Sequence, residues 1–416
     1  PLSQETRMKR FVCLFLLVFL TAPAFPQNPE IVPNENLVVE GIPKIPASLA
    51  ETVERYTNFR GASLDSWDPV KREMLISTRF ADTAQIHLVK MPGGARTQLT
   101  FYPDSVSGAQ YSPASGNSFV FSKDIGGNEF FQVYRFDNES GDVTLLTDGK
   151  SRNVAAVWSY DGQKLAYGST RRNGNDVDLY VVEPANSKSD RMLTQLQGGG
   201  WEPLDWSPDN RKILVREEIS ANESYLWIVE ASNGEKTLIT PKGGAKIAYG
   251  GGQFSKDGKG IYVTTDKDSE FQRLAYVDPA SKQHNYLSSH ISWDVDEFDL
   301  SYDGRTIAFV TNEDGFGVLH LLDTKTAKEK PVPDLPKGIA SGVRWHKNNR
   351  DLGFNITSAR STSDVYSLDV QTGKVDRWTY SETGGLNTAN FSEPQLIHWK
   401  SWDGREISGF LYRPPA

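Results

Sequence analysis

One sequence pattern recurs seven times along the chain and constrains the fold more than any other feature. An aromatic or apolar residue, usually followed by Ser, precedes a turn and then a short apolar run, as in "WSYDGQKLAYGS" and "WSPDNRKILVRE". Repetition at this period is typical of propellers and solenoids. The steps between copies are 46, 47, 48, 48, 46 and 45 residues when counted between Ser66, Ser112, Ser159, Ser207, Ser255, Ser301 and His346.

Each copy has room for four short strands. In the third copy the strand-like runs "NVAAVW", "KLAYGS" and "DLYVVE" are followed by a last run that ends in Leu-Thr, and turns separate them. No copy shows the 3.6-residue apolar period of a helix, which excludes helical solenoids. The sequence therefore predicts an all-β fold, a seven-bladed β-propeller of four-stranded antiparallel blades. Stacking of blades around a ring is needed because a single blade cannot bury both of its faces.

The ends of the ring are expected to meet without strand exchange. Blade one, from about 62 to 100, and blade seven, from about 342 to 379, both contain four strands in sequence. We expect the seam between them to be held by side-chain packing alone, which makes it the weakest radial contact and a candidate opening for peptide. The aromatic residues that begin the copies should be buried between blades, among them Trp158, Trp206, Phe254 and Trp345.

The N-terminal part predicts export. A basic head at Met8, an apolar run of ten residues and a small-residue site near Ala24 are typical of a signal peptide, although a buried strand would give a similar run. Ten residues are too few to span a bilayer, so no stable membrane anchor is expected after signal removal. We expect a periplasmic or secreted protein. The predicted division is residues 1–27 for upstream residues and signal, 28–60 for an arm and helix, 61–390 for the propeller, and 391–416 for the start of another domain.

The only helix pattern lies directly before the ring. "PASLAETVERY" carries Ser48 and Glu51 at the spacing of a capping box, and Leu49, Val53 and Tyr56 form one apolar stripe. The proline-rich residues before it, 28–45, are expected to form an extended arm.

Composition excludes several functions. The net charge is −8, and nucleic-acid binding needs a basic patch that this chain lacks. The single cysteine, Cys13, lies inside the predicted signal, so no disulfide, thiolate nucleophile or cysteine metal ligand is expected in the mature chain. No cofactor is expected, since no Gly-rich phosphate loop opens a helix. The histidines have no metal-ligand spacing and are interpreted as structural or solvated: His87, His284, His290, His320, His346 and His398.

Three polar loops are the candidates for a functional surface. The loops between the second and third strands of blades two, four and six each contain Asn-Glu, and the "GGGWEPLDW" linker enters on the same face. These residues either cap turns or form a face for a partner domain or a cationic group. We expect this face to dock another domain. The candidate residues are Asn128, Glu129, Trp201, Glu202, Asn222, Glu223, Asn312 and Glu313.

The repeats resemble the propeller of the prolyl oligopeptidase family of serine peptidases. The resemblance rests on the form W-S-P-D-G-x-x-I-A-F with L-Y-x-x-D and L-T, and covers residues 48–416. "GGNEFFQVYRFD", "GGWEPLDWSPD", "SANESYLWIVE" and "TNEDGFG" are similar to its bacterial, acylaminoacyl-peptidase-like branch. TolB-like periplasmic propellers share the repeat, but they resemble the chain less because they have six blades behind an α/β domain.

The tail from Pro394, "PQLIHWKSWDGREISGFLYRPPA", resembles the entry hairpin of that family's α/β-hydrolase domain. The resemblance implies a Ser-His-Asp triad beyond Ala416, hydrolysis of short peptides through an acyl-enzyme, and a propeller that limits access by size. No Gly-x-Ser-x-Gly elbow is present. We therefore expect a truncated reading frame, inactive by itself, whose partners are its own hydrolase domain and peptide. The alternatives are a non-catalytic TolB-like interaction propeller and a metal-dependent propeller hydrolase.

Overall fold

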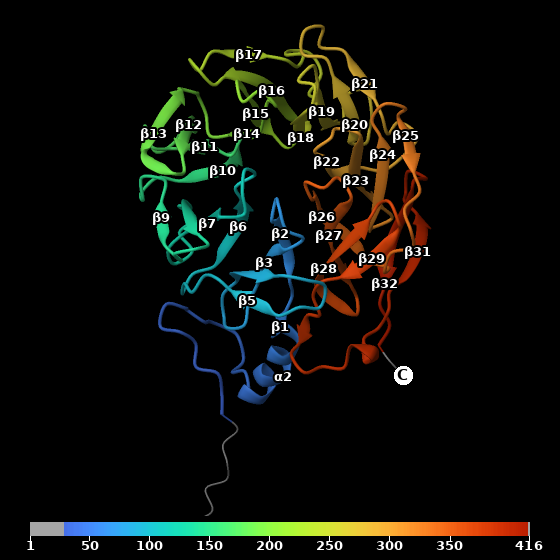
Figure 1. Ribbon diagram of the computed structural model, residues 1–416. Helices are drawn as coiled ribbons and strands as arrows, with labels where there is room; N and C mark the ends of the chain where they lie inside the picture. The colour runs from blue at the N-terminus through green and yellow to red at the C-terminus, as the bar shows by residue number, and fades with distance from the viewer. Residues whose placement is uncertain (1–28, 415–416) are drawn as a thin grey trace, which may run out of the picture. The chain divides into compact units, whose positions relative to one another are not determined.

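A computed structural model describes residues 29–414, and residues 60–382 with 387–414 form its larger compact unit. Seven antiparallel four-stranded blades follow one another around a central opening (Figure 1). The prediction of a seven-bladed propeller is confirmed. One parallel pairing, between Gly317 and Ile339, also joins blades six and seven into a single continuous sheet.

The strands of each blade follow in chain order from the inside of the ring outward. Blades one to three consist of β2 (Ser63–Trp67), β3 (Met74–Thr78), β4 (Gln85–Val89), β5 (Arg96–Gln98), β6 (Val106–Tyr111), β7 (Ser118–Lys123), β8 (Gln132–Asp137), β9 (Val143–Leu145), β10 (Asn153–Trp158), β11 (Leu165–Ser169), β12 (Asp178–Glu183) and β13 (Asn186–Thr194). Blades four and five consist of β14 (Trp201–Trp206), β15 (Lys212–Ser220), β16 (Glu223–Glu230), β17 (Lys236–Leu238), β18 (Tyr249–Phe254), β19 (Ile261–Thr265), β20 (Arg273–Val277) and β21 (His284–Tyr286). Blades six and seven consist of β22 (Val295–Leu300), β23 (Thr306–Glu313), β24 (Phe316–Asp323), β25 (Lys328–Lys330), β26 (Ile339–Trp345), β27 (Asp351–Ser358), β28 (Ser361–Asp369) and β29 (Lys374–Arg377).

The repeated Ser and Asp-Gly build the turn between the first two strands of a blade. In blade three, Ser159 Oγ donates to Asp161 Oδ1 at 2.6 Å and accepts the backbone N–H of Lys164 at 2.9 Å. Gly162 follows with φ of 68°, a conformation that costs glycine little. The same Ser–Asp hydrogen bond recurs in blades four, five and six. The motif therefore fixes the turn geometry that the repeat requires.

The aromatic residues that begin the repeats pack between blades, as predicted for three of the four. Trp206, Phe254 and Trp345 are buried, whereas Trp158 is half-buried. Trp206 Nε1 donates across the blade boundary to Val157 O at 3.0 Å. Each buried ring thus removes apolar area from water and also joins two blades.

The first repeat has a different register from the one counted on Ser66. Trp67 is buried and its Nε1 donates to Arg344 O at 3.0 Å, the role that the aromatic residue has in other blades. Asp68 N donates to Glu73 O, as Ser159 N does to Lys164 O. The equivalent of Ser112 is therefore Asp68, and the first step is 112 − 68, or 44 residues. The count was wrong because Ser66, which has the expected residue type, stands two residues before Asp68.

No strand is exchanged across the seam between blades one and seven. The sheet of blade one runs β2-β3-β4-β5 and that of blade seven ends β26-β27-β28-β29, all from continuous chain. The two-residue strands β1 (Phe59–Arg60) and β30 (Glu382–Thr383) form a separate sheet outside the blades. The prediction of complete terminal blades is confirmed.

The expectation that side-chain packing alone holds this seam is wrong. Ala62 N donates to Ser363 O at 2.8 Å, and Gly93 N donates to Trp378 O at 3.1 Å, so main-chain bonds cross it. They form because the segments beside β2 and β5 run along the outer strands of blade seven. The seam is therefore held by main-chain hydrogen bonds as well as by side-chain packing.

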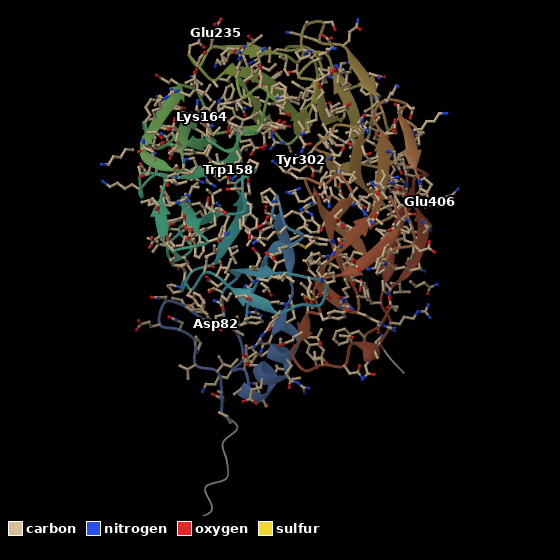
Figure 2. The ribbon with its side chains drawn as sticks, viewed as in Figure 1. Asp82, Trp158, Lys164, Glu235, Tyr302 and Glu406 are labelled. Atoms are coloured by element: carbon tan, nitrogen blue, oxygen red, sulfur yellow. The ribbon has the colours of Figure 1, made fainter. Side chains whose placement is uncertain are left out.

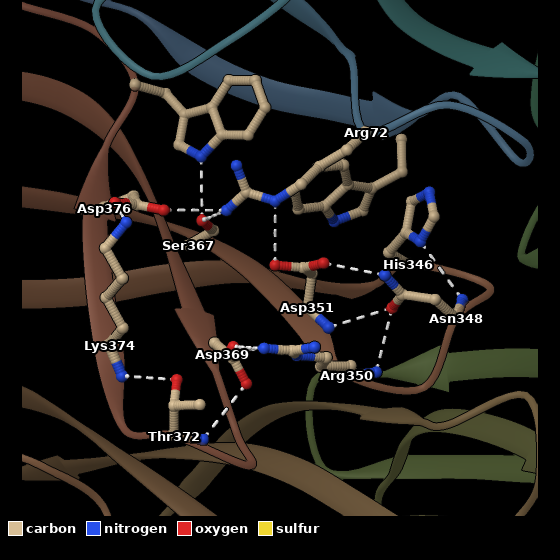
Figure 3. A network of polar contacts seen from close by, with 12 residues as sticks. Arg72, His346, Asn348, Arg350, Asp351, Ser367, Asp369, Thr372, Lys374 and Asp376 are labelled. Carbon is tan, nitrogen blue, oxygen red and sulfur yellow. Dashed lines mark hydrogen bonds and ion pairs between the residues drawn. The ribbon is translucent and has the colours of Figure 1, made fainter.

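A polar network centred on Arg72 adds to these bonds (Figure 3). Its guanidinium donates to Asp351 Oδ1 at 3.0 Å, to Asp376 Oδ2 at 2.9 Å and to Ser367 Oγ at 3.1 Å. Trp378 Nε1 donates to the same Ser367 Oγ at 2.8 Å. One arginine of blade one thus contacts three strands of blade seven.

The smaller compact unit comprises residues 29–59 and 383–386. Its helix α2 (Ala47–Thr57) has Pro46 as N-cap residue and no side-chain cap, so the prediction that Ser48 caps it is wrong, because Ser48 already lies in the first turn. Ala47 N donates to Pro29 O, so the preceding segment folds back and is not the extended arm expected. The stripe of Leu49, Val53 and Tyr56 is exposed.

Few other helical residues are present. A 3-10 turn, η1 (Thr388–Asn390), precedes the final hairpin of β31 (Gln395–Lys400) and β32 (Glu406–Leu411). Across residues 29–414, no helix has the length and apolar character needed to cross a membrane. The predicted signal and Cys13 lie outside the described residues.

Candidate functional site on the loop face of the ring

The antiparallel order of the strands gives the ring two different faces. We call loop face the side that carries the loops between the second and third strands of each blade, such as residues 124–131, 221–222 and 314–315. We call turn face the opposite side, which carries the Ser-Asp-Gly turns. In blades four, six and seven the central hairpins are long and their connecting loops have two residues. The loop face is therefore uneven, with three hairpins that extend farther than the rest.

Blade two presents an exposed carboxylate on this face. Asn128 Oδ1 accepts the N–H of Phe130 at 2.9 Å and so caps the loop. Glu129 has φ of 62°, and its N–H donates to Asp124 Oδ2 at 2.8 Å. Its side chain is 72% exposed, with Arg152 at 3.9 Å. Backbone contacts therefore fix the position of Glu129 while its carboxylate stays available to a partner.

In blade four the corresponding residues already contact other side chains. Asn222 Oδ1 accepts from Ser220 Oγ at 2.9 Å. Glu223 Oε1 accepts the hydroxyl of Tyr225 at 2.6 Å, and this hydrogen bond raises the pKa of Tyr225. Lys246 lies 3.9 Å from the other carboxylate oxygen. Glu223 thus already has a hydrogen-bond partner in Tyr225 and a nearby cation in Lys246.

Blade six holds its glutamate in a chain of titratable groups. Asn312 Oδ1 accepts the N–H of Gly315 at 3.0 Å. Glu313 Oε1 accepts from Thr311 Oγ1 at 2.9 Å and lies 3.1 Å from His320 Nε2. The chain continues from His320 Nδ1 to Glu329 at 3.1 Å. These contacts hold the hairpin together and leave Glu313 little capacity for a further ligand.

The linker into blade four contributes less surface than the sequence suggested. Trp201 is 5% exposed and its Nε1 donates to Gln197 O at 2.7 Å, so it belongs to the core and is not displayed on the face. An aromatic residue at the start of a buried inner strand packs against the next sheet. Glu202 Oε1 lies 2.6 Å from Arg216 Nη2, which also contacts Glu218 at 3.2 Å.

The candidate pairs do not form one cluster. They belong to blades two, four and six, and within residues 29–414 no hydrogen bond or ion pair joins one pair to another. Asn128, Asn222 and Asn312 cap or brace their own loops, as the turn-cap interpretation expected. Glu129 is the candidate whose carboxylate is most exposed.

The final hairpin lies against the loop face, a contact that no sequence signal indicated. Arg405 Nη1 lies 3.0 Å from Glu270 Oε1 in blade five. In blade six, His398 Nε2 lies 3.4 Å from Asp314 Oδ1. The ring of Phe410 meets that of Phe316 edge to face, with centroids 5.0 Å apart. The chain that leaves blade seven therefore continues over the loops of blades five and six.

The centre of the ring contains a cavity of about 390 Å³ toward the turn face. Every inner strand has a register shift, or bulge, that turns extra side chains toward the channel. Among the lining residues are Asp65 and Asp205, and burial raises the pKa of each to about 7. Sequence reasoning missed this cavity because the bulges are not visible as a motif.

The histidines form no metal site. His87 is fully buried with Nδ1 3.0 Å from Gln85 O, and His346 Nε2 lies 3.1 Å from Lys71 O across the seam. No group of three or more His, Cys, Asp or Glu side chains could hold a metal ion in the part of the chain that the structure describes.

The chain is similar in sequence to two curated peptidases. No protein-family model matches the chain. It is 26% identical over 211 residues, 50% of its length, to the uncharacterized peptidase YuxL of Bacillus subtilis. It is 24% identical over 222 residues to dipeptidyl-peptidase 5 of Porphyromonas gingivalis. The matches span only 30% and 31% of these two relatives.

Among solved structures, a prolyl endopeptidase superposes with a TM-score of 0.71 at 16% identity, and the match covers 88% of this chain and 56% of that one. This similarity shows the propeller fold.

Proposed function

Because the chain resembles the propeller part of prolyl oligopeptidase family peptidases in sequence and in fold, we propose that it is the substrate-gating propeller of a serine peptidase that cleaves short peptides. In this proposal a Ser-His-Asp triad lies on an α/β-hydrolase domain that follows residue 416, and the propeller contributes no catalytic residue. A ring with a closed seam restricts access by size.

The position of the final hairpin carries the proposal. β31 and β32 contact blades five and six through an ion pair, a His–Asp contact and an aromatic pair, all on the loop face. A domain that continues from β32 therefore begins beside this face. The outward side of the hairpin is rich in exposed aromatic residues, with Trp402 97% exposed and Trp399 and Tyr412 also exposed. Apolar surface of this kind is typical of a docking region.

We assign Glu129 the ion pair that the loop face would make with a peptide or with the hydrolase domain. Its carboxylate is 72% exposed on a fixed backbone, and its one cation, Arg152, lies at 3.9 Å, so it can also pair with the free amine of a peptide or with an arginine of the hydrolase domain. Glu223 is a weaker candidate, since Tyr225 and Lys246 already contact it. Removing one partner of a desolvated charge pair costs on the order of 3–5 kcal/mol.

The test uses the parent protein, including the sequence downstream of residue 416. Purified parent protein should hydrolyse short chromogenic peptides, and Ser→Ala at a downstream Gly-x-Ser-x-Gly should abolish the activity. Glu129→Gln should lower peptide turnover or the stability of the domain interface. Glu139→Gln, an exposed residue at a turn on the other face, is the matched control. A parent protein without peptidase activity would refute the proposal, and an unaffected Glu129→Gln variant would refute the role of this residue.

Export through the segment from Met8 to about Ala24 is part of the same proposal, supported by its basic head and apolar run. A fusion of residues 8–40 to a reporter that is active only outside the cytoplasm should be active in a bacterial host. A reporter that remains inactive would contradict export.

A further inference from the structure

Each blade has one residue directly after the repeated Ser position, and several of these residues lie around the turn-face end of the central channel. In blades three, five, six and seven this residue is Tyr160, Lys256, Tyr302 and Lys347, and all four line the central cavity with Pro113 of blade two. Figure 2 shows Tyr302 and the neighbouring Trp158 beside the central opening.

These side chains reach across the channel to one another. Lys256 Nζ donates to the hydroxyl of Tyr160 and lies 4.5 Å from its ring centroid and 5.7 Å from that of Tyr302. Lys347 Nζ donates to Pro113 O and lies 5.5 Å from the Tyr302 ring. These contacts therefore connect blades two, three, five, six and seven at the turn-face end of the channel.

The pocket formed by the central cavity contains three cations that form no close ion pair within residues 29–414, although Asp205 and Asp299 attract Lys256, and Asp65 attracts Arg344. Lys256, Lys347 and Arg344 all line it, and among the residues that the structure describes none of them forms an ion pair with a carboxylate. Their donors contact a hydroxyl, a main-chain carbonyl and, for Arg344, Val343 O at 2.8 Å. Burial lowers the pKa of both lysines. Lys256 and Lys347 are half-buried and Arg344 is exposed, so an anion that enters would give all three a direct charged partner.

The carboxylates that line the same pocket already accept hydrogen bonds, two of them across blade boundaries. Asp205 Oδ2 accepts the N–H of Phe254 at 2.8 Å, and Asp299 Oδ2 accepts that of Trp345 at 2.7 Å. Asp65 Oδ2 accepts from Ser77 Oγ at 2.6 Å. Since burial raises the pKa of Asp65 and Asp205 to about 7, both are partly neutral near pH 7. The carboxylates therefore offset the positive charge of the cations only in part.

We propose that this pocket binds the C-terminal carboxylate of a short peptide through Lys256, Arg344 and Lys347. A volume of about 390 Å³ is at the lower end of the range for small-molecule pockets, which suits a di- or tripeptide. The half-buried Trp158 supplies an apolar wall. The choice of a peptide as the source of the carboxylate rests on the proposed function, whereas the anion site itself does not.

Calorimetric titration of the chain tests the proposal. The dipeptide Ala-Phe should bind, its C-terminal amide should bind at least tenfold more weakly, and inorganic phosphate should also bind more weakly than the dipeptide. Lys347→Met and Arg344→Gln should each weaken binding of the dipeptide about tenfold or more, because a charge-assisted hydrogen bond is lost. Lys347→Arg, which keeps the charge, should restore most of the affinity. Lys259→Met, on an exposed lysine of the turn face, is the control and should leave affinity unchanged.

Equal affinity for the dipeptide and its amide overturns the proposal, and so does unchanged affinity in both charge variants. Equal affinity for phosphate identifies a general anion pocket and overturns the peptide assignment. Thermal unfolding of each variant shows whether a loss of binding reflects a loss of fold. Because binding is measured without turnover, absence of peptidase activity in the parent protein would leave this result standing.

Discussion

The guanidinium of Arg72 in blade one lies 5.0 Å from the ring centroid of Trp378 in blade seven, and the two side chains share Ser367 as a hydrogen-bond partner. The first and last blades are thereby joined without a shared strand. Asp351 and Asp376, the carboxylates on Arg72, are 7% and 17% exposed. Partly desolvated charges thus add to the main-chain bonds and apolar packing that close the ring.

Arg72→Met should lower the free energy of unfolding by roughly 2–4 kcal/mol, since it leaves Asp351 without its close cation and Asp376 with only Lys374, 2.9 Å away. Chemical denaturation of the chain measures the change. The control is Arg305→Met, an arginine in the equivalent turn of blade six whose side chain is 83% exposed and 3.9 Å from Asp303. Surface pairs of this kind contribute little. Equal effects of the two substitutions would show that the seam does not depend on Arg72.

Trp206→Ala should destabilise the chain by about 3–5 kcal/mol, because a fully buried indole leaves a cavity and an unmade hydrogen bond to Val157 O. Trp402→Ala removes the same side chain from a site that is 97% exposed and should change the stability by no more than about 0.5 kcal/mol. Urea denaturation followed by circular dichroism compares the two. A small loss for Trp206→Ala would refute its role in joining the blades.

Asp205→Asn should stabilise the chain at pH 8 but not at pH 4. The folded-state pKa of about 7 exceeds the ordinary value of 3.8, so the folded chain binds more protons than the unfolded chain between these pH values. Stability therefore falls as pH rises from about 4 to 7, and asparagine removes this loss while it can still accept from Phe254 N. The gain at pH 8 should be about 1–2 kcal/mol, below the upper limit of roughly 4 kcal/mol that the difference in pKa allows. Denaturation curves from pH 4 to 8 measure it, with the exposed Asp142→Asn as control. A gain that is the same at every pH would contradict the assignment.

Phe410→Ala should release the final hairpin from the loop face without unfolding the ring. The aromatic pair with Phe316 is lost, while the Arg405–Glu270 contact is exposed and contributes little. Hydrogen exchange in residues 395–411 should accelerate, and the midpoint of global unfolding should stay within a degree or two. Trp399→Ala, on the same hairpin, is the comparison. Unchanged exchange in Phe410→Ala would show that Phe410 does not hold the hairpin in place.

The repeat predicted the blade count, the strand order and the burial of most aromatic residues. Turns and short strands depend on residues that are adjacent in the sequence, so their pattern is visible there. The repeat did not predict the seam. Arg72 looks like any surface arginine in the sequence, and only the closure of the ring brings Asp351 and Asp376 to it.

The candidate site was predicted only in part. Asn128 and Asn312 do cap loops, but burial of Trp201 depends on packing between sheets and has no local signal. The pocket in the channel could have been found by aligning the seven repeats and comparing the residues at each equivalent position. The residue after the repeated Ser position is Lys or Tyr in four blades and Pro in the other three, at Pro69, Pro113 and Pro208. Equivalent positions of the blades meet at one end of the channel in a closed ring.

The outermost strands described above bear on how this protein behaves at high concentration. Five of the seven have only three residues: β5, β9, β17, β21 and β25. A short edge offers few unpaired N–H and C=O groups to a neighbouring molecule, and charged residues such as Lys328 and Lys330 occupy it. The nine-residue β13 in blade three is the exception, and Lys188, Asp190 and Arg191 interrupt it with charge. Most outer edges of this ring are thereby too short to template pairing with another molecule, and in blade three the protection of a long edge depends on side-chain charge alone.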